Sequence, residues 1–196
     1  MLLRSLHRRS ASPAVDALKT LVPPPGVGTS INWTDVHKRF GLRLPDDYEL
    51  IVENYGAGSF DDTLTIWVPD GHGGDDLFAF ATAAADRLED ARDAASTRVL
   101  VEPDESAQSV DLGNGPLLFT PWGTASGGYF GYWHRCHRDP NKWPILFTDL
   151  AGVWLYHRQG LAQFLIDLLD GKFPCPTTES ELPSTHVFAT AAEKRD

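Results

Sequence analysis

Apolar residues recur at helical spacing over several stretches of the chain. Trp33, Val36 and Phe40 are three and four residues apart, a spacing that gathers apolar side chains on one face of a helix. Residues that favour helix ends flank these stretches. Gly41 stands where a left-handed C-cap belongs, and Pro45 suits a first turn. The pattern predicts helices over the ranges 33–40, 45–55, 75–97 and 161–170.

Alternation along shorter stretches predicts strands. Leu64, Ile66 and Val68 alternate with their neighbours at the period of a half-buried strand. Residues 149–152 are a hairpin signal between two more such stretches. The expected strands are 64–68, 99–101, 116–120, 129–134, 145–148 and 153–156. Short turns between them favour an α+β fold with an antiparallel, mostly meander β-sheet and helices packed on one face.

The two ends of the chain differ in composition from the middle. Residues 1–28 are basic and proline-rich, and Pro23-Pro24-Pro25 stops a short amphipathic helix that precedes it. Residues 173–196 are rich in proline, serine and threonine. We therefore expect a flexible N-terminal arm over 1–28, a folded domain over 29–172, and a disordered or loosely docked tail over 173–196.

Composition and charge narrow the class of protein. With 42% hydrophobic and 11% aromatic residues, the chain can bury a sizeable core. Its 27 acidic residues outnumber the 17 basic ones and give a net charge of −10. That balance argues against binding the phosphates of nucleic acids. It favours a basic protein partner, whose association acidic charge would steer.

The cysteine content and the lack of long apolar runs indicate the cellular compartment. Two cysteines, Cys136 and Cys175, do not make a disulfide framework. The basic N-terminus is not followed by the apolar stretch of an export signal, and no apolar run has the length of a membrane span. We therefore expect a cytoplasmic protein that does not enter a membrane.

Several short segments carry a family resemblance in their order and spacing over residues 31–171. The segments are Trp33 in the first predicted helix, Gly41-Leu-Arg-Leu44-Pro45-Asp-Asp-Tyr48, Tyr55-Gly56-Ala-Gly58-Ser-Phe60, Leu118-Phe-Thr-Pro121-Trp122-Gly123, Gly128-Tyr-Phe-Gly-Tyr-Trp133, Asp139-Pro140-Asn-Lys-Trp143-Pro144 and Gln163-Phe164-Leu165. Together they resemble the SMI1/KNR4 family, also called SUKH, whose fold is α+β. We expect structural roles for these residues: Gly56 and Gly58 permit positive φ before a strand, and Pro121-Trp122-Gly123 ends a strand with a large ring at the sheet edge or core.

The resemblance implies binding and not catalysis. Many bacterial members of this family are immunity proteins that bind and block toxin domains, often nucleases, and no catalytic motif defines the family. We therefore expect no enzymatic activity, no cofactor and no metal, and a cognate toxin domain of basic character as the partner. Fungal members regulate through protein contacts, so a regulatory or scaffolding adaptor is the alternative.

Acidic residues in or beside predicted loops are the candidates for contact with a basic partner. They are Asp61, Asp62, Asp70, Asp75, Asp76, Glu102, Asp104 and Glu105. Acidic loops could occupy the basic cleft of a nuclease and raise the association rate. Ordinary solvated surface is the alternative explanation for each of them.

His134, Cys136 and His137 form the remaining cluster with chemical potential. His134 and Cys136 alternate to the same side of a predicted strand, but a metal site needs three or four converging ligands. We interpret the histidines as surface residues where a strand turns into a loop. A metal-dependent enzyme built on this trio is the least favoured hypothesis.

Overall fold

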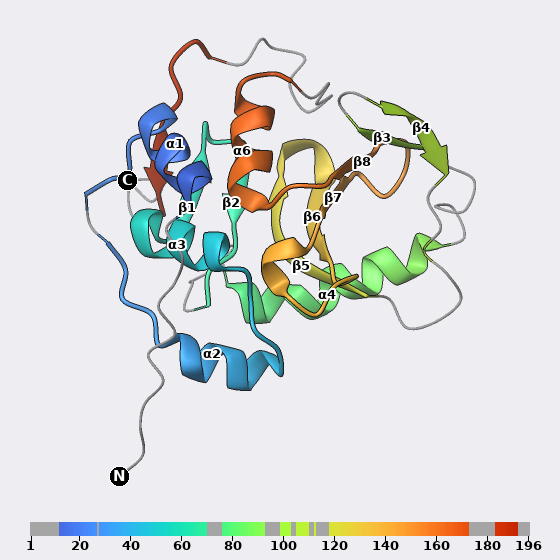
Figure 1. The fold of residues 1–196 in the computed structure, drawn as a ribbon, viewed down its shortest axis with the longest axis horizontal. Coiled ribbons are helices and arrows are strands. Elements are labelled where there is room, and N and C mark those ends of the chain that lie inside the picture. The colour runs from blue at the N-terminus through green and yellow to red at the C-terminus, as the bar shows by residue number, and fades with distance from the viewer. Residues whose placement is uncertain are drawn as a thin grey trace.

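The structure is a computed structural model. It describes residues 12–26, 28–69, 76–92, 99–102, 105–109, 112, 118–172 and 183–191. Of 99–102 and 105–109 it describes the backbone. The arrangement of helices and strands is shown in Figure 1.

Helices form where the apolar spacing predicts them. Their bounds are α1 Pro13–Leu21, α2 Trp33–Phe40, α3 Asp46–Tyr55, α4 Leu77–Asp90 and α6 Leu161–Leu169, with short 3-10 turns η2 Ser126–Gly128 and η3 Pro140–Lys142. Gly41 ends α2 with a φ of 73°, so the predicted left-handed C-cap is confirmed. Asp75 and 93–97, which the prediction included in the longest helix, lie outside the described residues.

The described strands form a nine-stranded sheet in the order β4-β3-β8-β7-β6-β5-β2-β1-β9. Their bounds are β1 Gly58–Phe60, β2 Leu64–Ile66, β3 Val99–Glu102, β4 Glu105–Ser109, β5 Phe119–Ala125, β6 Tyr129–His134, β7 Ile145–Thr148, β8 Trp154–His157 and β9 Phe188–Thr190. β5 to β8 form an antiparallel meander, which includes the predicted hairpin between β7 and β8. β3 pairs with β8 in parallel. The α+β class and the largely antiparallel sheet are confirmed.

Several strands depart from the prediction: β1, β4 and β9 were not predicted, and β5 has different bounds. β5 does not end at Pro121-Trp122-Gly123 but runs on to Ala125, with a register shift between Pro121 and Gly123. A bulge accommodates the proline, which has no N–H to donate to the ladder. β1 was not predicted because its three residues, Gly58–Phe60, are too short to show alternation. Gly58 itself is not among the glycines with positive φ, whereas Gly56 has a φ of 70°.

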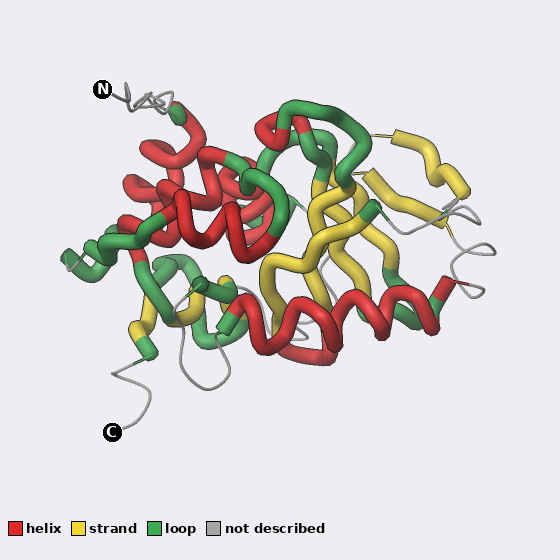
Figure 2. Tube along the Cα trace, turned by 90° about the horizontal axis from the view of Figure 1, so that it is seen from below, coloured by secondary structure: helices red, strands yellow, loops and turns green. Residues whose placement is uncertain are grey.

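Helices cover both faces of the sheet, whereas the sequence predicted one. Phe147 of β7 lies 5.2 Å from Tyr129 of β6 and 5.4 Å from Phe164 of α6, measured between ring centroids. On the opposite face, the hydroxyl of Tyr132 donates to the backbone oxygen of Ala84 in α4 at 2.9 Å. Tyr129 and Tyr132 point to opposite faces because side chains alternate along a strand. Figure 2 shows α4 as the long helix along one side of the strands.

The core is built around large rings that need glycine as a neighbour. Trp122 is fully buried, and its indole lies over the backbone of Gly131 on the next strand. A Cβ at position 131 would come within 2.6 Å of three atoms of that indole. Phe147 and Phe164 pack against the other sides of the ring, with centroids 6.4 Å and 5.8 Å away. Trp122 therefore sits in the core and not at the sheet edge.

The described parts of both chain ends pack against this core, whereas the sequence predicted a flexible N-terminal arm and a disordered or loosely docked tail. Ser12 caps α1 by accepting from the backbone N–H of Val15 at 3.4 Å, and Val15 and Leu18 are buried. The hydroxyl of Tyr55 donates to the backbone oxygen of Val22 at 2.7 Å. At the other end, β9 pairs with β1. The amphipathic face of α1 is stable because α3 and α6 offer it an apolar surface, a partner that local sequence does not reveal.

Candidate functional site

The β1–β2 turn holds the first two predicted contact residues and directs one of them inward. Asp61 and Asp62 both have positive φ, 49° and 54°, as expected in a tight hairpin turn. The Asp61 side chain is 5% exposed; its carboxylate lies 2.6 Å from Nδ1 of His186 and accepts from the backbone N–H of Val187 at 2.9 Å. Asp62 is exposed to solvent. Asp61 is therefore a structural residue.

The other predicted acidic contacts lie on several elements. Asp76 is the N-cap of α4, where its carboxylate accepts from the backbone N–H groups of Phe78 and Ala79 at 2.8 Å and 3.2 Å. Glu102 ends β3 and pairs in register with Glu105, which begins β4. The remaining candidates, Asp70, Asp75 and Asp104, lie outside the described residues.

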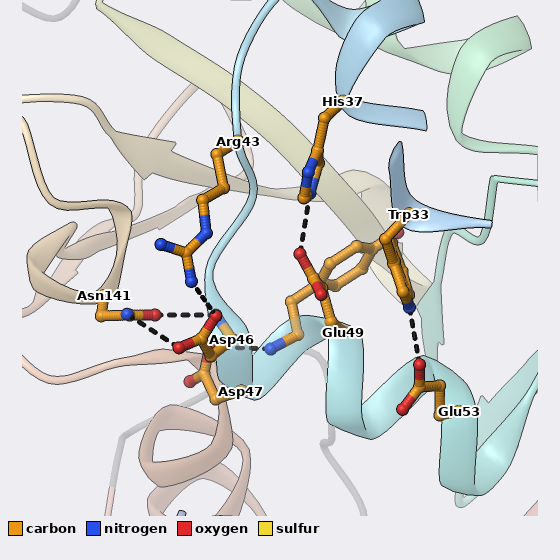
Figure 3. A network of polar contacts seen from close by, with 9 residues as sticks. Trp33, His37, Arg43, Asp46, Asp47, Glu49, Glu53 and Asn141 are labelled. Atoms are coloured by element: carbon orange, nitrogen blue, oxygen red, sulfur yellow. Dashed lines mark hydrogen bonds and ion pairs between the residues drawn. The ribbon is translucent and has the colours of Figure 1, made fainter. Parts of the chain in front are cut away.

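Two of the segments that carry the family resemblance meet at the N-terminus of α3, as shown in Figure 3. The backbone N–H of Asp46 donates to Oδ1 of Asn141 at 2.7 Å, and Nδ2 of Asn141 donates to Asp46 at 3.1 Å. The guanidinium of Arg43 pairs with the same carboxylate. These reciprocal bonds join two segments that are 95 residues apart in the chain. They tie the turn η3 to the start of α3.

Aromatic rings extend this meeting point into the core. Tyr48 is fully buried; its ring lies edge-on to Trp133 at 5.0 Å and to Trp33 at 5.9 Å, between centroids. Its hydroxyl donates to the backbone oxygen of Trp67 at 2.7 Å. Trp143, also buried, donates from Nε1 to the backbone oxygen of His137 at 2.6 Å. Leu44, Pro45 and Pro144 are buried beside them. The resemblance therefore rests on residues that hold the core together.

Asp47 links α3 to α6. Its carboxylate accepts from the backbone N–H of Ala162, in the first turn of α6, at 3.0 Å and from that of Tyr48 at 2.8 Å. Burial raises the pKa of the Asp47 carboxyl, while the backbone donors act in the opposite direction. A Cβ on Gly160 would lie 2.5 Å from an Asp47 oxygen, so this close approach requires glycine. Asp47 therefore lies in the first turn of α3 but caps α6.

A second pair of contacts aligns α2 with α3. His37 Nε2 lies 2.7 Å from Oε1 of Glu49, and Nε1 of Trp33 donates to Oε1 of Glu53 at 2.7 Å (Figure 3). Within each helix the two partners are four residues apart, so they lie on one face. Glu49 is 3% exposed. Its pairing with His37 therefore contributes more to stability than the Trp33–Glu53 bond, because an unpaired buried carboxylate is costly.

A cavity of about 300 Å³ opens beside this network, between α1, α3 and α6. Its lining mixes polar groups with a larger share of apolar surface, and it consists of Ser12, Pro13, Ala14, Asp46, Asp47, Asn141, Gln159, Gly160 and Gln163. The volume is at the lower end for ligand pockets. Asp46, Asn141 and Gln163 place carboxylate and amide groups at its wall. Asp47 contributes little to recognition, because backbone donors already engage its oxygens.

The histidine and cysteine cluster has a different arrangement from a metal site. His134 Nδ1 lies 2.8 Å from the hydroxyl of Tyr156, and its ring stacks on Phe119 at 4.6 Å. Burial lowers the pKa of His134. Cys136 and His137 are exposed in the loop that follows. Among the described residues, no group of three His, Cys, Asp or Glu side chains is placed to hold a metal ion.

The C-terminal half of α4 presents acidic side chains that the sequence reasoning did not single out. Asp86, Glu89 and Asp90 are exposed, and Asp90 is the last residue of the helix. Negative charge at this end opposes the helix dipole, at a cost of roughly 0.3–1 kcal/mol for each group near the terminus. Figures 1 and 2 both place this end of α4 at the same end of the molecule as the β3–β4 hairpin. We call these three residues the α4 acidic end.

No family model, curated protein or solved structure matches this chain. None of the helices in the described part of the chain combines the length and the hydrophobicity needed to cross a bilayer.

Proposed function

We propose that this protein is a SUKH-type binding module that neutralises a cognate toxin domain by forming a stoichiometric complex with it. The observation that carries the proposal is the convergence of three of the resembling segments on the first turn of α3. Asp46 contacts Asn141, and Tyr48 contacts both Trp33 and Trp133. Segments that are scattered in sequence but interlocked in space are expected when the resemblance reflects a shared fold.

Charge supports a basic partner. Residues 86–111 contain eight acidic and three basic residues, so this stretch alone carries a net charge of −5 of the chain's −10. It spans the α4 acidic end and the β3–β4 hairpin with Glu102 and Glu105. Glu89 pairs with Arg92 at 2.8 Å, but helix-dipole preference does not explain the exposed Asp86 and Asp90, for which a binding role is the better explanation. We assign the toxin-binding surface to this end of the molecule.

The first test is co-expression with the toxin encoded next to this gene. A tagged copy of the protein is captured from cells that carry both genes, at low and high salt. We expect relief of growth arrest and a single basic partner in equimolar amount, whose capture weakens as salt screens the charges. Growth arrest without rescue, together with no complex, would exclude the toxin function. Capture of many housekeeping proteins would favour the adaptor.

A matched pair of variants then tests the surface. Asp86→Asn/Asp90→Asn removes two exposed charges from the α4 acidic end, and Asp16→Asn/Asp35→Asn removes two exposed charges from α1 and α2. Both doubles change the net charge equally. We expect the first to slow association with the purified toxin about 3- to 10-fold at low salt, and the second to leave it nearly unchanged. Equal effects from the two doubles would refute the assigned surface.

A further inference from the structure

The last described segment, 183–191, adds an edge strand to the sheet. β9 pairs antiparallel with β1, with Phe188 opposite Phe60 and Thr190 opposite Gly58. Backbone hydrogen bonds between the two segments continue beyond both ends of the strand: Asp61 N–H donates to Val187 O, and Ala191 N–H donates to Ala57 O, both at 2.9 Å. Addition of an extended segment to a free sheet edge is a common mode of peptide recognition.

Side chains of this segment contact specific residues at the β1 edge, which we call the acceptor edge or, for short, the acceptor. The Phe188 ring lies against Tyr55 and Phe60, with centroid distances of 5.1 Å and 4.9 Å. Two residues earlier, His186 is 9% exposed and its Nδ1 lies 2.6 Å from the Asp61 carboxylate. Val187, between them, is 55% exposed. The acceptor thus recognises alternate residues, as strand addition requires.

Two residues of the acceptor, Asp61 and Gly58, allow β9 to pack closely against β1. The positive φ of Asp61 places its carboxylate where it also accepts from the backbone N–H of Val187 at 2.9 Å. A Cβ on Gly58 would come within 2.7 Å of the Phe188 ring and would meet the backbone oxygen of Ala189. Glycine at 58 is therefore needed for β9 to dock, although its φ does not require it.

We propose that the β1 edge, with Asp61 and the Tyr55–Phe60 pair, is a binding site for an extended His-x-Phe segment, and that it accepts residues 183–191 of a second copy of this chain in exchange for its own. The segment that fits is present in every copy. Ten residues separate Lys172 from Pro183, enough to span up to about 33 Å when extended. Because exchange remakes the same contacts, its main cost is the entropy of association. The proposal does not depend on the toxin function.

Two full-length variants test exchange by complementation. Phe188→Ala weakens the segment and leaves the acceptor intact, whereas Gly58→Val blocks the acceptor and leaves the segment intact. Each alone should be a monomer, and an equal mixture should form a 1:1 dimer in native mass spectrometry. The control mixture pairs Phe188→Ala with Gly58→Val/Phe188→Ala, which has no intact segment, and should stay monomeric. A monomeric test mixture of folded variants would overturn the exchange.

A labelled peptide of residues 183–191 tests the site without relying on the fold of the Gly58 variant. We expect it to bind the full-length Phe188→Ala protein at least 10-fold more tightly than the wild type, whose own segment competes. Replacing phenylalanine by alanine in the peptide should abolish binding, whereas replacing the exposed valine by alanine should not. Adding Asp61→Asn to the protein should weaken binding. No binding to the Phe188→Ala protein, or equal loss from both peptide changes, would refute the site.

Discussion

Substitution of Gly131 by alanine tests whether the resembling segments act through packing. The new Cβ would come within 2.6 Å of three atoms of the Trp122 indole, which must then move by about 1.4 Å to reach ordinary contact. The indole is fully buried, with Phe147 and Phe164 against its other sides, so little space is open to it. Overpacking of this kind costs about 3 kcal/mol. The lower backbone entropy of alanine in the unfolded chain offsets about 0.5–1 kcal/mol of that cost.

The net expectation for Gly131→Ala is a loss of about 2 kcal/mol in the free energy of unfolding. Urea unfolding followed by tryptophan fluorescence measures it, and the midpoint should fall by about 1 M for a slope near 2 kcal/mol per M. In a Trp122→Leu background the same substitution should cost little, which gives a coupling energy of at least about 1 kcal/mol. A Gly131→Ala protein as stable as the wild type, or an equal loss in both backgrounds, would refute the packing argument.

Three further predictions concern the polar contacts. Alanine at Asp46 and at Asn141 should each cost about 0.5–1.5 kcal/mol. The double variant should cost less than the sum, because both changes break the bond from Asn141 Nδ2 to the Asp46 carboxylate. Full additivity in urea unfolding would count against the link. Burial acts to raise the pKa of Asp167, but hydrogen bonds from His157, Lys172 and Gln163 hold this pKa below its ordinary value. Asp167 therefore contributes stability that is present above the unfolded pKa near 3.8. This stability is lost as pH falls through the folded pKa. The stability difference between wild type and Asp167→Asn should therefore shrink on acidification below about pH 4, and a difference that is constant with pH would contradict it. Burial lowers the pKa of His134, so its ring protons should titrate in NMR spectra below the ordinary histidine value of about 6.5; titration above that value would be inconsistent with the desolvated ring.

The polar contacts were less predictable than the core. Asp46 and Asp47 are adjacent in the first turn of α3, yet one binds Asn141 in η3 and the other caps α6. Local signals could not distinguish these roles, because each partner lies far along the chain. Asp61 was likewise predicted to contact a partner or solvent, whereas it contacts His186, 125 residues away in the chain. The exposed acids at the end of α4 conflict with the helix dipole, and that conflict was a signal available in the sequence.

The sequence by itself determined which stretches become helices and strands in the middle of the chain. The spacing of Trp33, Val36 and Phe40 and the left-handed Gly41 specify α2 locally, and turn residues 149–152 specify the β7–β8 hairpin. Such features depend on backbone preferences and on apolar periodicity over a few residues. The sequence also determined the α+β class, because short strands with tight turns favour an antiparallel sheet.

Only the tertiary structure decided how the ends of the chain are used and which faces of the sheet are covered. β9 is three residues long and becomes a strand because β1 offers it backbone partners and a place for Phe188. α4 lies on the face opposite α6 because Tyr132 and Phe147 present apolar surface on both sides of the sheet. These outcomes depend on burial and hydrogen bonding between distant segments, whose free energy is gained only when the whole sheet has formed.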